Sequence, residues 1–523
     1  MSCNKKLRFG AVCLCLGAIL VTFASTAAVY PLKVAPGRRH LEDQQGTPVL
    51  IQADSPWSLI VALTTNEAET YLEDRRQKGF NAVIANLIEH QFEGASNPYS
   101  APRNRYGDAP FTTAGDFSTP NEAYFAHADW VIDRAAEKGI VLLLTPCYLG
   151  YPGTSEGWYN EVLANSVETC RQYGRFVGNR YKDRTNIIWV MGGDRNPDNA
   201  RSRVEAMVEG IQEYDTNHIF TAHCLPENSS RDQYDGSAWL SLNAVYTYDP
   251  VHVKCLNAYL DSPVMPFILF ETAYENDFLN ANAARVRFQS YSAMLAGACG
   301  QAFGNYPIWS FNSGWQNALD SSGSVSMMYL KRLFQSRSWY DLVPDSSHVV
   351  VTSGYGSSSS WVGCARTSDG ATVIAFLPSG SATITVNMSK VSGSDVNAWW
   401  FNPRDGSADL EGTYPASGNH NFTRPNSSDW VLVLDDASLK LRAPGTPKIT
   451  LQVPLQSSST ISEGGFQFNL VADTPGTYAI DYTTNLSTPW IQATTVQYES
   501  GITNVSVDTG GDPHRFFRAR PMP

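Results

Sequence analysis

The sequence has little positive charge. It contains 38 Lys and Arg residues against 50 Asp and Glu residues, which gives a formal net charge of −12 at pH 7. Nucleic acids and anionic membrane surfaces attract proteins that carry clustered basic side chains. We therefore expect neither nucleic acid nor an anionic membrane as a partner. An acidic glycan would need Arg or Lys residues placed locally in its binding cleft.

Motifs for metal chemistry and for nucleophilic Ser or Cys chemistry are also missing. The sequence has no CxxC pair and no HExxH motif, and no glycine-rich phosphate loop follows its first predicted strand. It also lacks a Ser-His-Asp constellation of the hydrolase type. We therefore expect no metal and no cofactor, and we find no basis for a protease.

Cysteine is sparse. Of nine cysteines, three lie close to the N-terminus, and the other six are scattered along the chain. Export would permit disulfides, but the spacing selects no particular pairing. We favour free, buried thiols for most of them. These six are Cys147, Cys170, Cys224, Cys255, Cys299 and Cys364.

One apolar run, at the N-terminus, has the features of an export signal. Lys5, Lys6 and Arg8 precede an apolar stretch over 9–24, and small residues follow it. The stretch is too short for a comfortable transmembrane helix, and no other segment is suited to span a membrane. We predict a signal peptide over 1–28. The mature protein would be secreted or periplasmic, without membrane insertion.

Aromatic residues are abundant. The chain contains 13 Trp and 25 Tyr, and 43% of its residues are hydrophobic. Sugar-binding clefts use aromatic rings because the apolar face of a sugar stacks on them. Large cores and sandwich domains would explain the same composition, so composition alone does not decide between the two.

From about residue 55 to 335, strand patterns alternate with helical patterns, which indicates a parallel α/β fold. Eight such repeats match the size of a (β/α)8 TIM barrel. A doubly wound sheet is the alternative, but the phosphate loop typical of it is missing. The predicted strands are 57–63, 80–87, 140–146, 186–191, 218–222, 243–246, 267–270 and 301–303. The main predicted helices are 66–78, 121–138, 158–181, 200–214, 251–260 and 281–298.

The pattern changes near residue 340, where helical periodicity gives way to short strands separated by Gly, Pro, Asn and Asp. This is typical of a β-sandwich. A linker over 441–447 contains proline and precedes another strand-rich segment. The expected organisation is a signal peptide (1–28), a catalytic (β/α)8 barrel (29–340), a β-sandwich domain (341–440) and a small C-terminal β module (447–523).

Two carboxylates directly follow buried strands of the predicted barrel. The strand at 186–191 ends in two glycines and Asp194, and the strand at 267–270 ends in Glu271. The carboxyl ends of barrel strands open into one cleft, and these are the fourth and seventh of eight strands. Across that cleft, carboxylates can approach to about 5–5.5 Å, as in retaining glycosidases. We assign Glu271 as the nucleophile and Asp194 as the acid/base.

Other polar and aromatic residues also follow the predicted strands. By the same rule they are expected at the carboxyl ends of the strands, where they can contact a sugar. For most of them a place in the wall or core is equally compatible with the sequence. The predicted substrate-binding residues are Asn86, His90, Tyr148, Asn196, His223, Tyr246, Tyr274 and Trp309.

Structural roles compete with some of these assignments. Asp194 could cap the next helix or pair with Arg195, since Asp in such turns often caps. Glu275 is expected to cap a helix or bind an arginine rather than act in catalysis. Asp54 and Arg103 could be either solvated or functional.

Several stretches carry a resemblance to a known family: 57–59 and 71–81, 188–194, 271–275 and 291–309, then 400–406 and 429–434. Over about residues 34–436 the chain resembles the apiosidase-like proteins of glycoside hydrolase family 140 and their relatives. Those proteins are (β/α)8 barrels, often followed by a domain of the collagen-binding type. The resemblance implies an acid/base Asp after the fourth strand and a nucleophilic Glu after the seventh, which correspond to Asp194 and Glu271. It also implies apiose-containing pectin as the substrate class.

The chain departs from similar proteins at two positions. Thr272 stands where a proline often follows the glutamate, and Gln301 stands where a histidine is frequent. These changes leave the chemistry intact and bear on the substrate. The leading hypothesis is a secreted retaining glycoside hydrolase that acts on plant or microbial polysaccharide, with an oligo- or polysaccharide as partner. The alternative is a non-catalytic carbohydrate-binding protein on a vestigial barrel.

Overall fold

The computed structural model describes residues 28–92, 97–248, 250–446, 449–452, 466–472, 476–484, 490–498, 503–507 and 516–522. Except for residue 28, the predicted signal peptide lies outside these ranges and stays a prediction. Within them, no helix combines the length and the hydrophobicity needed to cross a bilayer.

Eight parallel strands form the predicted (β/α)8 barrel. Except between β8 and β10, each strand pairs with the next along the chain, and the last, β12, returns to pair with β4. The ring closes between β8 and β10, where Phe220 bridges to Leu240 and the short antiparallel β9 (Asn228–Ser229) pairs with β10. The barrel strands are β4 (Ile51–Asp54), β5 (Ala82–Asn86), β6 (Val141–Thr145), β7 (Ile187–Gly192), β8 (Phe220–His223), β10 (Asn243–Tyr246), β11 (Phe267–Glu271) and β12 (Gly300–Phe303).

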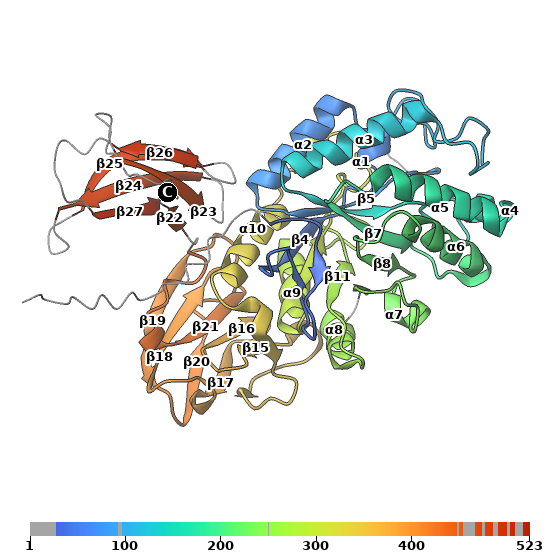
Figure 1. Cartoon of the computed structure of the whole chain (residues 1–523). Helices are drawn as coiled ribbons and strands as arrows, with labels where there is room; N and C mark the ends of the chain where they lie inside the picture. The colour runs from blue at the N-terminus through green and yellow to red at the C-terminus, as the bar shows by residue number, and fades with distance from the viewer. Residues whose placement is uncertain are drawn as a thin grey trace, which may run out of the picture.

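Helices surround the strands, as Figure 1 shows. Their buried faces pack on the outside of the sheet, whose strands are buried along their whole length. The helices are α1 (Leu59–Ala62), α2 (Thr65–Gln77), α3 (Glu122–Glu137), α4 (Tyr159–Ala164), α5 (Val167–Tyr181), α6 (Arg201–Gln212), α7 (Ser230–Tyr234), α8 (Val251–Leu260), α9 (Ala283–Leu295) and α10 (Ser322–Gln335).

The first strand is the main error of the sequence-based assignment. A strand was expected over 57–63, but the barrel begins with β4, and helix α1 occupies the predicted range. All four residues of α1 are buried. A short apolar run that is buried on every side gives the same pattern in a strand and in a helix, so periodicity could not separate the two.

The single helix expected over 158–181 is two helices. Helix α4 ends before Asn165, and the Ser166 hydroxyl then caps α5 by accepting the backbone N–H of Thr169 at 3.0 Å. A serine that accepts this bond satisfies one of the unpaired N–H groups at the start of a helix. The break therefore lies where a capping residue permits a new start.

The second domain is a sandwich of a six-stranded and a three-stranded sheet, both antiparallel. Their facing sides bury a common apolar core. A three-stranded sheet of β1 (Lys33–Val34), β2 (Leu41–Glu42) and β3 (Pro48–Val49) precedes the barrel. The sandwich strands are β13 (Leu342–Pro344), β14 (Val351–Ser353), β15 (Gly363–Thr367), β16 (Thr372–Leu377), β17 (Thr383–Asn387), β18 (Asp395–Phe401), β19 (Ala408–Pro415), β20 (Asn419–Thr423) and β21 (Trp430–Asp436).

The six-stranded sheet of the sandwich packs against the barrel helices α9 and α10. Phe376 of β16 stacks on Tyr291 of α9, with ring centroids 4.6 Å apart. Arg287 of α9 binds Asp429 at the start of β21, with Nε 2.6 Å from Oδ2. Apolar residues of both domains share one buried cluster. The sandwich therefore braces the side of the barrel, away from the ends of β7 and β11.

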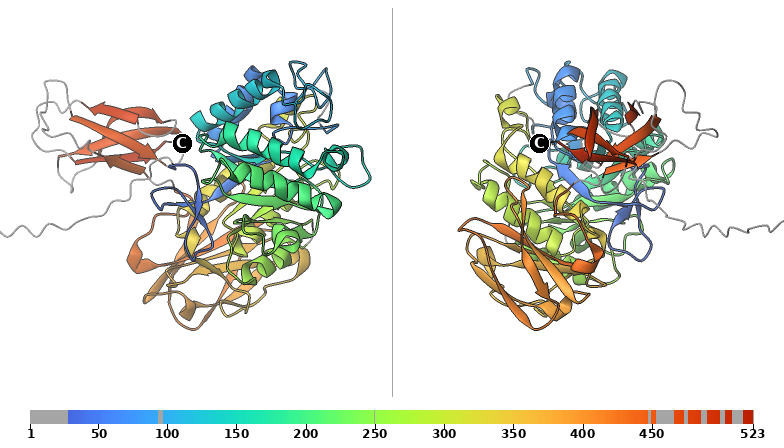
Figure 2. Two further views of the ribbon diagram at one scale, coloured as in Figure 1. Left: turned by 45° about the vertical axis from the view of Figure 1, so that its right-hand side comes forward. Right: turned by 90° about the vertical axis from the view of Figure 1, so that its left-hand side faces the viewer.

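The C-terminal module consists of two small antiparallel sheets. It lies to one side of the barrel and sandwich in Figure 1 and in the left view of Figure 2, and in front of the barrel in the right view of Figure 2. The six cysteines named above are all free and buried. The strands of the module are β22 (Ile449–Gln452), β23 (Phe466–Ala472), β24 (Gly476–Thr483), β25 (Ile491–Tyr498), β26 (Thr503–Val507) and β27 (Phe516–Pro521).

Candidate active site

The end of β7 makes an unusual turn. Gly192, Gly193 and Asp194 have φ angles of 88°, 120° and 51°. A Cβ on Gly192 would lie 2.5 Å from the carbonyl oxygen of His223, and one on Gly193 would lie 2.4 Å from the Tyr148 ring. Only glycine fits these two positions. An aspartate in the left-handed region costs about 1–3 kcal/mol, and such strain often marks a functional site.

Asp194 has neither of the structural roles that compete with catalysis. The next helical turn, Asp198–Ala200, is preceded by Pro197 as its N-cap residue. Arg195 lies over the ring of Tyr159 at 3.5 Å, and its Nη1 donates to the Gly150 carbonyl at 3.5 Å rather than to Asp194. Asp194 Oδ1 is buried without a hydrogen-bond partner, and Oδ2 lies 3.4 Å from the Tyr148 hydroxyl. No structural bond therefore accounts for this carboxylate.

Glu271 ends strand β11 and is only 8% exposed. The hydroxyls of Tyr246 and Tyr274 face its carboxylate and favour the ionised form. Trp57 Nε1 in turn donates to the Tyr274 hydroxyl at 2.8 Å, which fixes the position of that ring. His223 Nε2 lies 2.9 Å from Glu271 Oε2, although its N–H points off the line to that oxygen.

The ring of His223 links the two carboxylate positions. Its Nδ1 accepts the backbone N–H of Asp194 at 3.0 Å, so the proton of the neutral ring resides on Nε2, which faces Glu271. The ring stacks on Trp57, with centroids 5.2 Å apart. Burial lowers the pKa of His223 to about 4, so the imidazole is neutral near pH 7.

Asp194 and Glu271 line one cavity of about 350 Å³. It opens at the carboxyl ends of the barrel strands, and its walls are largely aromatic. Five predicted substrate-binding residues lie in this wall: Tyr148, His223, Tyr246, Tyr274 and Trp309. The other lining residues are Trp57, Phe92, Glu156, Tyr248, Thr272, Asp277 and Phe278.

Three predicted substrate-binding residues lie outside this cavity. Asn86 is fully buried at the end of β5. His90 packs on Trp158, with ring centroids 4.9 Å apart. The Asn196 side chain accepts the backbone N–H of Leu225 at 3.2 Å. These residues follow barrel strands and therefore lie at the predicted end of the barrel. The strand-end rule does not predict the directions of their side chains, which do not line the cavity.

The prediction also missed lining residues, for two reasons. Trp57 follows the true first strand, so correct placement of β4 would have made it a candidate. Glu156, Asp277 and Phe278 lie several residues into long loops, which no strand-end rule reaches. Glu275, by contrast, has the expected structural role, since its Oε1 accepts the backbone N–H of Gly323 near the start of α10.

Burial raises the pKa of both central carboxyls. The pKa of Asp194 rises to about 7, through burial and then through the charge of Glu271. The pKa of Glu271 rises to about 8, through burial, against the opposing effect of the Tyr274 hydroxyl. Because the two groups interact, the pair holds about one proton near neutral pH and titrates as a unit. One protonated and one ionised carboxyl is the state needed for acid-assisted displacement.

Two further carboxylates, Glu156 and Asp277, line the cavity, and none of its described lining residues is Lys or Arg. Glu156 Oε1 lies 3.4 Å from the Tyr148 hydroxyl and accepts the backbone N–H of Tyr151 at 3.0 Å. The Tyr148 hydroxyl therefore stands between Glu156 and Asp194. In the described part of the chain, no group of three or more His, Cys, Asp or Glu is placed to hold a metal ion.

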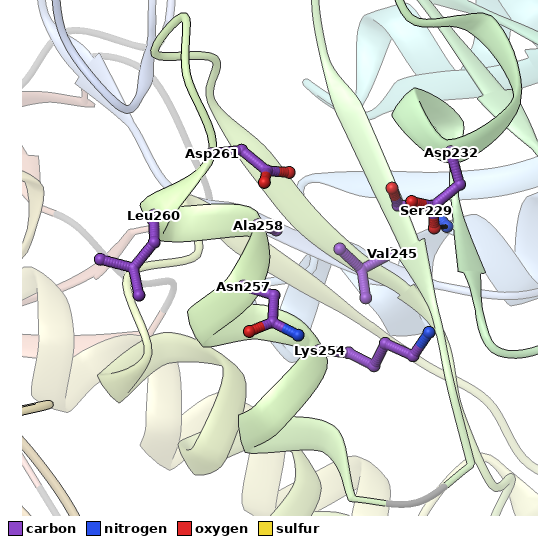
Figure 3. A pocket seen from close by; sticks show the side chains of 8 residues that line it. All are labelled: Ser229, Asp232, Val245, Lys254, Asn257, Ala258, Leu260 and Asp261. Atoms are coloured by element: carbon purple, nitrogen blue, oxygen red, sulfur yellow. Dashed lines mark hydrogen bonds between the residues drawn. The ribbon is translucent and has the colours of Figure 1, made fainter.

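A separate hollow lies on the flank of the barrel, between α8 and the strands β9 and β10. Figure 3 shows its polar side chains, among them Asp232, Lys254 and Asp261. Lys254 is already bound to the carbonyl oxygen of Glu227. Neither Asp194 nor Glu271 lines this hollow, so it does not belong to the carboxylate site.

A (β/α)8 barrel in which one buried and one partly buried carboxylate line an aromatic cavity, together with the similarities that follow, identifies the protein as a glycoside hydrolase. A solved structure described as a glycoside hydrolase is 26% identical, with a TM-score of 0.68 over 78% of this chain and 97% of that one. A glycoside hydrolase family 5 protein from Bacteroides vulgatus ATCC 8482 is 24% identical, with a TM-score of 0.68 over 78% and 93%. A search of curated proteins finds no significant match.

Family models identify the first two domains. Residues 35–341 match the family described as "Apiosidase-like, catalytic domain". Residues 343–435 match that described as "Putative collagen-binding domain of a collagenase". The chain belongs to the apiosidase-like family, and its substrate is a saccharide.

Proposed function

We propose that the protein is a secreted retaining glycoside hydrolase of the family 140 type, in which Glu271 is the nucleophile and Asp194 the acid/base. One observation carries the proposal: the buried carboxylate of Glu271 and the partly buried carboxylate of Asp194, from strand ends on opposite sides of the barrel, line the same cavity without a neutralising cation. Strongly shifted pKa values in such a cavity support a catalytic role. The export-type features of residues 1–28 support secretion.

The surroundings of the two carboxyls support the division of roles. Although the higher pKa falls on Glu271, the hydroxyls of Tyr246 and Tyr274 face its carboxylate and stabilise a negative charge there. Asp194 lines the cavity and its Oδ2 has only a long contact, of 3.4 Å, with the Tyr148 hydroxyl, so its carboxyl is available to give a proton to a substrate oxygen. The oxygen of a bound glycosidic linkage would accept a hydrogen bond from the protonated carboxyl of Asp194. This bond would stabilise the protonated form of Asp194.

The reaction would proceed in two displacements. In the first, Glu271 attacks the anomeric carbon while Asp194 gives its proton to the departing oxygen, and a glycosyl ester forms on Glu271. In the second, the ionised Asp194 takes a proton from water, the water oxygen attacks the anomeric carbon, and the ester bond breaks. The sugar leaves with its original anomeric configuration, and both carboxyls return to their starting states.

Apiose-containing pectin is the substrate class that we propose. The family description supports an apiosidase-like activity, and the cavity suits the neutral apiose unit rather than the uronates of pectin, because no described lining residue is Lys or Arg. Another furanoside or pyranoside would be cleaved by the same chemistry. A vestigial binding protein would not need an aspartate in a strained turn whose Oδ1 is buried without a hydrogen-bond partner.

The test is incubation of the protein with a panel of pectic and hemicellulosic oligosaccharides, with products identified by mass spectrometry. The variants Asp194→Ala and Glu271→Ala should each lose turnover by at least about 10²- to 10⁴-fold while they retain glycan binding. Glu137→Ala, on the exposed side of α3, is the control and should match the wild type. Glycan binding without turnover in the wild type and in both variants would instead indicate a binding protein.

A further inference from the structure

The turn after β11 separates the catalytic cavity from a second pocket. Tyr274, Asp277 and Phe278 line the cavity, whereas Glu275 and Asn276 line the second pocket, which has a volume of about 640 Å³. Consecutive residues of one turn thus form a wall that is common to both hollows. The remaining walls of the second pocket come from the starts of α9 and α10 and from the loop after β12.

Backbone hydrogen bonds hold this wall in place. The Glu275 N–H donates to the Gly304 carbonyl at 2.9 Å, and the Tyr306 N–H donates to the Glu275 carbonyl at 2.9 Å. The Asn276 N–H donates to the Ala281 carbonyl at 2.9 Å. Both hollows are therefore preformed, as expected of ligand sites.

Exposed aromatic rings lie on both sides of the wall. Phe278 is 69% exposed at the catalytic cavity, and Tyr306 is 43% exposed in the second pocket. Tyr248 supports Phe278 edge-on, with ring centroids 5.9 Å apart. Exposed rings of this kind offer flat apolar surface to the C–H face of a sugar, and such surface is left exposed to water when no ligand covers it.

The lining of the second pocket is polar and carries no positive charge. Amide and hydroxyl side chains predominate, among them Asn276, Asn317, Ser321 and Ser322. None of the described residues that line either hollow is Lys or Arg. Neutral donors and acceptors of this kind match sugar hydroxyls, whereas a uronate would meet several carboxylates and no cation.

We propose that the second pocket is a saccharide-binding subsite, so that a neutral oligosaccharide spans the wall, with one sugar unit in the catalytic cavity and a further unit on Tyr306. This inference rests on the proposed function, because it concerns the substrate of the same site. It predicts that the enzyme distinguishes an oligosaccharide from a small glycoside by contacts remote from the bond that is cut.

The test compares Tyr306→Ala with Tyr214→Ala, a control whose tyrosine is similarly exposed but follows α6 at the opposite end of the barrel. Two substrates are used: the longest oligosaccharide cleaved in the panel, and an aryl glycoside of its reacting sugar. For Tyr306→Ala we expect KM for the oligosaccharide to rise about three- to tenfold, which is the loss of one aromatic contact. Its kcat, and both constants for the aryl glycoside, should stay within about twofold of the wild-type values.

An equal change for both substrates, or no change for either, would overturn the subsite. Calorimetry with the Glu271→Gln variant provides a readout that does not need turnover. Neutral pectic oligosaccharides should bind this variant more weakly once Tyr306→Ala is added. Oligogalacturonate of equal length should not compete with them for binding. If either result is not obtained, the second pocket is not a subsite for a neutral sugar. Absence of turnover by the wild type would refute the proposed function alone, because binding that depends on Tyr306 would still stand.

Discussion

Two aspartates at strand ends of the barrel, Asp54 and Asp194, have opposite surroundings. Asp54 ends β4 and is fully buried, with Oδ2 2.6 Å from Arg75 Nε and 2.5 Å from the Tyr71 hydroxyl. Asp194 follows β7, and its Oδ1 is buried without any partner. Arg75 also binds Ser324 of α10, so the Asp54 pair ties the barrel to two of its helices.

The difference separates a carboxylate paired with a cation from the one that we propose as the acid/base. Removing a carboxylate from water is costly, and at Asp54 a buried arginine and a hydroxyl offset that cost. At Asp194 and Glu271 no cation offsets it, and the pKa values of both carboxyls rise. The sequence left open whether Asp54 is solvated or functional, and the structure shows it buried in an ion pair. Carboxyls without such a pair are the ones that we propose for catalysis.

The largest expected effect separates the two aspartates directly. Asp54→Asn should lower the free energy of unfolding by about 3–5 kcal/mol, because it leaves Arg75 buried without its partner. Asp194→Asn should leave that free energy unchanged or higher but lower kcat by about 10²- to 10⁴-fold. Denaturant unfolding together with kinetics on the folded fraction measures both. Similar unfolding curves for the two variants would remove the distinction.

The turn that carries Asp194 should be nearly as sensitive. Gly193→Ala places a methyl group 2.4 Å from the Tyr148 ring at a φ of 120°, so the turn must shift. We expect kcat to fall about 100-fold, since misplacement of a catalytic group by about 1 Å has effects of this size. Gly153→Ala is the matched control, because its φ is also positive but no atom lies within 4 Å of the added Cβ. Equal kcat values for the two variants would contradict this explanation.

The pH dependence of stability gives a moderate effect with a defined sign. The pKa values of Asp194 and Glu271 are about 7 and 8 in the folded state, against usual values of 3.8 and 4.5. The folded state therefore binds their protons more tightly, so their contribution favours folding below about pH 4 and is lost as the pH rises to about 8. The free energy of unfolding of Glu271→Gln should therefore rise relative to that of the wild type as the pH is raised from about 4 to about 8. A constant difference between pH 4 and 8 would show that Glu271 titrates normally.

Glu156 should have the smallest effect. Its charge raises the pKa values of Asp194 and Glu271 further, and the Tyr148 hydroxyl lies between it and Asp194. Glu156→Gln should move the basic limb of the kcat/KM profile to lower pH by less than about one unit, with little change at the optimum. Glu161→Gln, outside the cavity, is the control. An unshifted basic limb for Glu156→Gln would exclude this electrostatic role.

Much of the barrel could be predicted because its signals are local. Apolar runs bounded by Gly, Pro and capping residues identified seven of the eight strands, and the strand-end rule led to Asp194 and Glu271. The first strand was missed because the run after Trp57 is buried on all sides, a pattern compatible with a helix as well as a strand.

The rest of the site depends on directions that sequence position does not set. Asn196 follows the correct strand, but its side chain turns away to bind the backbone at Leu225. Glu156 reaches the cavity because its loop folds back, with the Trp158 N–H donating to the Tyr148 carbonyl at 2.8 Å. Such contacts join residues that are not ordered by any periodic pattern, so they emerge only from the folded chain.

Azide rescue tests the central claim most directly, because it assigns a different product to each carboxylate. With an activated aryl glycoside, azide should restore turnover of Asp194→Ala and yield a glycosyl azide of retained configuration, since the ester on Glu271 still forms. With Glu271→Ala, azide should replace the nucleophile and yield the inverted glycosyl azide. The roles assigned to Asp194 and Glu271 would be contradicted if Asp194→Ala gave the inverted azide and Glu271→Ala the retained one. They would also be contradicted if the wild type were active and azide rescued neither variant.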